Sequence, residues 1–114
     1  IQLVEPSKIA LKEQIMLMSK ATVLITPRGG ISFIGMYQSP GAFSICLESP
    51  DPAWRITENE YFWQNLNYLK QIMYPVSHVD LDCSMTSNRD NCDINVDPVK
   101  MSYYVKQALF EMSL

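Results

Sequence analysis

Two continuous apolar runs lie in the first half of the chain, and both are typical of strands in a parallel sheet. Ala21–Thr26 is aliphatic and β-branched almost throughout, which predicts a central strand covered on both faces. Ala42–Leu47 is a second run and follows a turn signal at Gln38–Gly41. Ile31–Tyr37 fits a short helical turn. Parallel strands need a connection of about a dozen residues, so the segment predicts a strand, a crossover and a strand.

Helical spacing of apolar residues marks both ends of the chain. Ile1–Val4 predicts a short strand, and Ser7 is placed to cap a helix. The apolar positions of that helix are Leu11, Ile15 and Met18. Asp97 followed by Pro98 is a cap residue followed by a preferred first helical residue. The terminal helix that they introduce has one apolar face, formed by Met101, Val105, Ala108 and Met112.

The middle of the chain predicts one more helix and a polar segment. Thr57 and Glu60 form a capping-box signature. The apolar stripe of the helix that follows consists of Phe62, Leu66, Leu69 and Met73, with a short strand expected at Tyr74–Val76. Ser77–Val96 is polar and predicts irregular structure. Alternating strands and helices indicate an α/β fold with a mostly parallel sheet.

Composition narrows the class of protein. The chain has 114 residues, 47% of them hydrophobic, which suits a single domain with a packed core. Acidic residues outnumber basic ones by 12 to 9 and no basic run is present, so nucleic acid is not an expected partner. No apolar stretch approaches the roughly 18 to 20 residues of a membrane span. Because the chain starts at Ile1, inside a predicted strand, we expect a fragment whose signal or anchor lies upstream.

The loop after the first apolar run is the first candidate site. Ligands of open α/β sheets bind beyond the carboxyl ends of strands, where helix N-termini present backbone N–H groups. Gly29 and Gly30 would let the backbone approach a diphosphate, Arg28 would supply a positive charge, and Ser32 would donate a hydroxyl hydrogen bond. The alternative is a plain strand-to-helix turn.

Acidic residues give two further candidates. Glu48 ends the second apolar run, where a carboxylate can accept both hydroxyls of a ribose; the alternative is a solvated strand end. Asp80 and Asp82 could hold a divalent ion, but the pattern is common by chance and we expect no metal site. His78 is the only histidine and has no companion ligand motif, so we interpret it as a loop residue.

Cysteines and aromatic residues leave alternatives open. Cys83 and Cys92 either form a bridge that closes one loop, which requires an oxidising compartment, or remain free thiols. An aromatic cluster supplies either a sugar-stacking platform or, at helical spacing, packing in the core or at a domain interface. Its members are Trp54, Tyr61, Phe62, Trp63 and Tyr68.

The segment Leu11–Leu47 resembles the family 61 glycosyltransferases. The shared features, in order, are a helix with Glu13-Gln14, a strand at Val23–Thr26, the loop Arg28-Gly29-Gly30, a short helix at Ile31–Tyr37, the turn Pro40-Gly41 and a strand at Ala42–Leu47. The Tyr74-Pro75 strand, the two-cysteine loop and the Asn95-Val96-Asp97 entry to the last helix are similar more loosely. One departure is Arg28, which stands where the family commonly has His. Arginine can contact phosphates but cannot transfer protons, because its pKa is too high.

The resemblance implies the C-terminal, Rossmann-like half of a two-domain enzyme of the GT-B type. This half would bind a nucleotide-diphosphate sugar, expected to be a UDP-sugar, for inverting transfer to a hydroxyl of a protein or glycan. No bound cofactor is implied, and the catalytic base would lie on the missing N-terminal half, so the fragment alone would be inactive. The expected compartment is the Golgi or endoplasmic reticulum lumen. The alternative is a non-catalytic lumenal binding or structural module that retains the fold.

Overall fold

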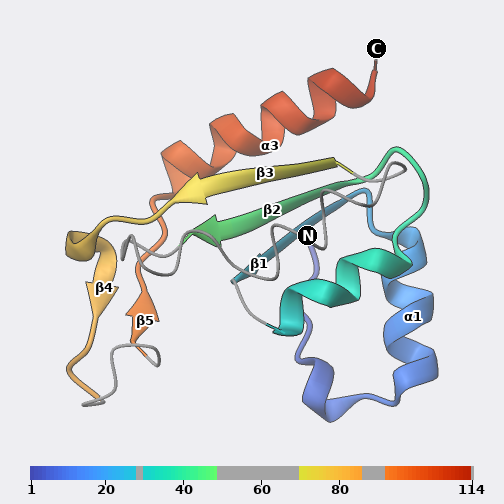
Figure 1. Cartoon of the computed structure of the whole chain (residues 1–114), viewed down its shortest axis with the longest axis horizontal. Helices are drawn as coiled ribbons and strands as arrows, with labels where there is room; N and C mark the ends of the chain where they lie inside the picture. The colour runs from blue at the N-terminus through green and yellow to red at the C-terminus, as the bar shows by residue number, and fades with distance from the viewer. Residues whose placement is uncertain (28–29, 49–69, 86–91, 114) are drawn as a thin grey trace.

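The structure is a computed structural model that describes residues 1–27, 30–48, 70–85 and 92–113. Strands and helices alternate through most of this part of the chain (Figure 1). In chain order they are η1 (Pro6–Lys8), α1 (Leu11–Lys20), β1 (Val23–Pro27), η2 (Gly30–Tyr37), β2 (Phe43–Glu48), β3 (Lys70–Pro75), η4 (His78–Asp80), β4 (Leu81–Asp82), β5 (Asp93–Ile94) and α3 (Pro98–Met112). The α/β class expected from the sequence is therefore confirmed.

Among the described residues, the main sheet has three parallel strands in the order β1-β2-β3. β2 is the central strand, and its first five residues are buried, as expected for a strand covered on both faces. Of the strands that the structure describes, β1 lies at the edge, so the prediction of a central strand at Ala21–Thr26 is wrong in position, although the strand itself forms. Ile25 of β1 is accordingly 47% exposed. The segment Ile1–Val4 forms no strand, which corrects a second prediction.

Helices lie on both faces of this sheet (Figure 1). α3 packs across all three strands on one face, while η2 packs against β1 and α1 on the other. The turn between η2 and β2 is closed by the Ala42 N–H, which donates to the Ser39 carbonyl at 3.1 Å. Gly41 has a φ of 86° there, a conformation that glycine adopts without steric cost. The predicted crossover unit is thus present.

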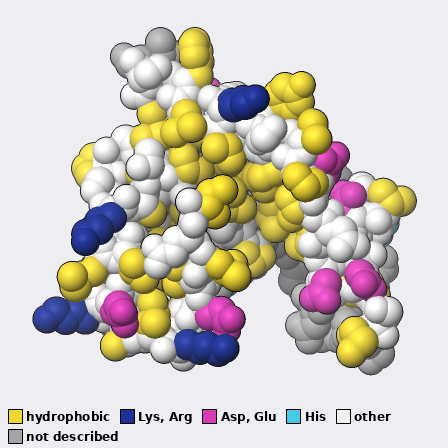
Figure 2. Space-filling model, turned by 180° about the vertical axis from the view of Figure 1, so that it is seen from behind, with side chains coloured by type: hydrophobic (Ala, Val, Ile, Leu, Met, Phe, Trp, Pro, Cys, Tyr) yellow, Lys and Arg dark blue, Asp and Glu magenta, His cyan; other side chains and the backbone are white. Residues whose placement is uncertain are grey.

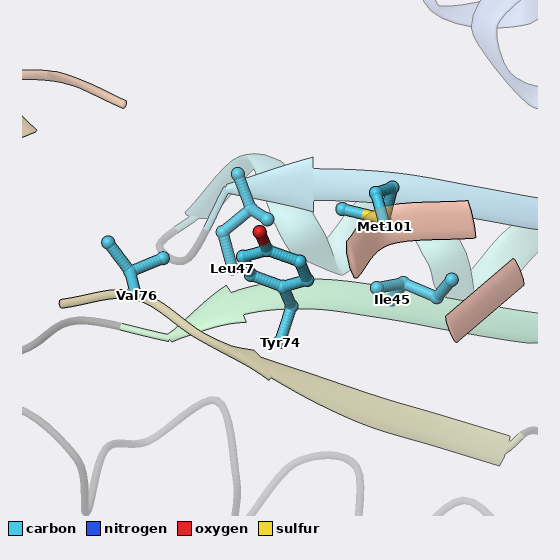
Figure 3. Close-up of a cluster of buried hydrophobic side chains, with 5 residues drawn as sticks. All are labelled: Ile45, Leu47, Tyr74, Val76 and Met101. Carbon is cyan, nitrogen blue, oxygen red and sulfur yellow. The ribbon is translucent and has the colours of Figure 1, made fainter. Parts of the chain in front are cut away.

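The hydrophobic core lies between α3 and the sheet. Figure 3 shows its buried members, which converge from β2, from β3 and the residue after it, and from α3: Ile45, Leu47, Tyr74, Val76 and Met101. Tyr74 also packs against Tyr104 of α3, with ring centroids 5.2 Å apart. Met101 and Ala108 are the buried residues of α3, which confirms the apolar face expected for the terminal helix.

Two helix boundaries differ from the sequence-based expectations. α1 begins at Leu11 with Ala10 as its N-cap, and Ser7 lies instead in the short helix η1. The side chain of Gln14 holds the two helices together, because Nε2 donates to the carbonyl of Pro6 at 2.7 Å. The helix expected to run to Met73 does not reach it, since β3 already begins at Lys70. The capping box Thr57 and Glu60, and the cluster around Trp54, lie outside the described residues.

The predicted irregular segment Ser77–Val96 contains a small hairpin instead. β4 and β5 pair antiparallel, with Leu81 opposite Ile94 and Asp82 opposite Asp93. Leu81 and Ile94 pack against the core cluster. A disulfide joins Cys83 to Cys92 beyond the paired residues, which confirms the bridge and rules out the free thiols considered above.

Candidate functional site

The three parallel strands end at one level, which we call the carboxyl edge: the end of the sheet formed by Pro27, Glu48 and Pro75. In the strand register Pro27 lies beside Leu47, and Glu48 lies beside Pro75. β1 and β2 are neighbours, and their last residues, Pro27 and Glu48, both lie at this edge. Ligands of open parallel sheets bind at such an edge.

The glycine loop leads from this edge directly into a helix. Arg28 and Gly29 lie outside the described residues. Gly30 is the first residue of η2, and Ser32 lies in its first turn. Since β1 ends at Pro27, only two residues separate the carboxyl edge from the N-terminus of η2. This is the strand, loop and helix order that presents backbone N–H groups to an anion.

Glu48 is the last residue of the central strand and is half-buried. Its neighbours on either side are the ends of β1 and β3, so its carboxylate belongs to the middle of the carboxyl edge. The structure therefore brings Gly30 and Glu48 to the same end of the sheet, as the sequence analysis expected.

Lys100 is a residue of this edge that the sequence analysis missed. Its Nζ donates to the carbonyl of Pro75 at 2.7 Å and lies 4.5 Å from the centre of the Tyr74 ring. The ammonium group is thus held at the end of β3 by a hydrogen bond and a cation–π contact. The local sequence does not identify it, because a lysine in the first turn of a helix is merely unfavourable for the helix dipole and does not show which group it contacts.

The N-terminus of α3 also faces this edge, but its amides are occupied. Oδ1 of Asp97 accepts from the N–H groups of Val99 at 2.9 Å and of Lys100 at 3.3 Å. This confirms Asp97 as the predicted cap residue. An incoming anion would have to compete with that carboxylate for the first N–H groups of α3.

The aspartates near the edge are engaged within their own loops. The pKa of Asp80 is lowered mainly by a hydrogen bond from the Ser77 N–H, then by the Ser77 hydroxyl and by the charge of Lys100. The pKa of Asp82 is lowered by hydrogen bonds from Ser84. His78 lies exposed in η4. Within the described part of the chain, no group of three His, Cys, Asp or Glu residues comes close enough to hold a metal ion.

Figure 2 shows the molecule from behind, where hydrophobic side chains gather in the middle of the surface and charged ones lie mostly around it. The large hydrophobic residues exposed in the structure include Ile25, Met36, Val99, Tyr103 and Phe110. Apolar gatherings of this kind are typical of surface that another domain or partner covers.

None of the helices in the described ranges is both long and apolar enough for a membrane crossing.

Comparison with known proteins finds no matching family model, no matching curated protein and no matching solved structure.

Proposed function

We propose that this chain is the nucleotide-sugar-binding domain of a glycosyltransferase of the GT-B type. The observation that carries the proposal is the unit from β1 to β2: a strand, a loop with Arg28, Gly29 and Gly30, a short helix, and a second strand that ends at Glu48. In the structure the two strands are parallel neighbours, and both end at the carboxyl edge. The resemblance of Leu11–Leu47 to family 61 glycosyltransferases supports the same reading.

Each residue has a role in this proposal. Backbone N–H groups at the start of η2, together with Arg28, bind the diphosphate and offset the charge that develops on it as it leaves. Contributions of this type are worth roughly 3 to 4 kcal/mol per well-placed donor. Glu48 accepts hydrogen bonds from the ribose hydroxyls. The base that activates the acceptor hydroxyl, on a protein or glycan, belongs to the other half of the enzyme.

The disulfide supports an oxidising compartment as the location of this activity. Bridges such as Cys83–Cys92 form and persist in oxidising surroundings and are rare in the cytosol. We therefore place the protein in the secretory pathway, in the lumen of the Golgi or endoplasmic reticulum.

A titration of the chain with UDP in a calorimeter tests the binding role. Glu48→Gln should weaken UDP binding about tenfold, because charge-assisted hydrogen bonds to the ribose are lost. Arg28→Ala should also weaken it, with little change in stability. Glu111→Gln is the matched control: Glu111 lies near the far end of α3, away from the carboxyl edge, and the variant should bind as the wild type does. Equal affinity in all four proteins would reject the proposed site.

Turnover separates this proposal from a non-catalytic binding module, the alternative that Arg28 in the place of histidine favours. The assay uses the full protein with a UDP-sugar and a glycan or glycoprotein acceptor. Sugar transfer supports the enzyme, whereas tight binding without transfer supports the module. If no nucleotide sugar binds, both are wrong.

A further inference from the structure

We draw no further inference here: the strongest candidate, the exposed apolar surface patch of Val99, Tyr103 and Phe110 on the side of α3 turned away from the sheet, carries none because nothing in the structure shows what covers it.

Discussion

Gln38 and Phe43 are joined by a buried hydrogen bond, in which Nε2 of Gln38 donates to the Phe43 carbonyl at 3.1 Å. The same nitrogen donates to the Ala21 carbonyl at 3.2 Å, and the Gln38 residue is only 4% exposed. One side chain therefore ties the residue after η2 to the chain entering β1 and to the start of β2. These two hydrogen bonds fix the position of the crossover helix η2 relative to β1 and β2.

Replacing Gln38 by Leu should destabilise the protein by about 2 to 3 kcal/mol, because two buried carbonyl groups lose a donor. Ser39→Ala is the matched control. Its hydroxyl donates to the Ser19 carbonyl at 2.8 Å, but at an exposed position, so its loss should cost less than about 1 kcal/mol. Urea unfolding of both variants checks this. Equal losses in the two would show that the Gln38 bonds do not stabilise the crossover.

Ser44 should be replaceable by Ala at no cost. It is the second residue of β2, is 1% exposed, and its Oγ has no hydrogen-bond partner within the described residues. A buried hydroxyl without a partner is unfavourable, so Ser44→Ala should leave the free energy of unfolding unchanged or raise it by up to about 1 kcal/mol. A loss of more than 1 kcal/mol on urea unfolding would mean that the hydroxyl is hydrogen-bonded in solution.

The disulfide should stabilise the hairpin more than the sheet. Cys83 and Cys92 are nine residues apart in sequence, and a bridge closing so short a loop contributes about 2 to 3 kcal/mol. The double variant Cys83→Ala with Cys92→Ala should lose about that much and should no longer respond to reductant. Hydrogen exchange should speed up in β4 and β5 while β2 stays protected. Faster exchange in β2 by the same factor would contradict a local role.

The pH dependence of Asp80 follows from its hydrogen bonds. Ser77 donates to Oδ2 of Asp80 from both its N–H and its hydroxyl, at 2.9 Å each, and these bonds lower the pKa of the carboxyl group. A carboxyl group with a lowered pKa stabilises the folded state above its unfolded pKa of about 3.9, and this contribution is lost as the pH falls through the folded value. An NMR titration should place the pKa of Asp80 below that of an exposed aspartate. Ser77→Ala should raise it, and no change in this variant would rule out the bond as the cause.

The elements that the sequence predicts correctly carry their own local signals. β2 and α3 follow from a continuous apolar run and from the Asp97-Pro98 start with its apolar face. The spacing of Leu66, Leu69 and Met73 is helical, so the sequence predicts a later start for β3 than the structure has. Pairing with β2 sets the start of β3 at Lys70, because it places Lys70 beside Phe43 and Ile72 beside Ile45. The edge position of β1 is likewise set by pairing between distant segments. The paired strands of the hairpin, two residues each, are too short to show any pattern.

In the candidate site, too, some residues could be placed from the sequence and others could not. Gly30 and Glu48 could be placed at one edge from sequence, because consecutive parallel strands end on the same side of a sheet. Lys100 could not, because it reaches Pro75 across 25 residues through the packing of α3 on the sheet. Nothing in the local sequence indicates which strand end a helical lysine will meet.

An NMR titration of the ¹⁵N-labelled chain with UDP tests the binding edge directly. The backbone amides of Gly30, Glu48 and Lys100 should shift, because they lie at the carboxyl edge. Those of Ala42 and Lys70, at the opposite end of the same strands, should stay in place. Shifts confined to the opposite end, or no shifts at millimolar UDP, would contradict nucleotide binding at the carboxyl edge.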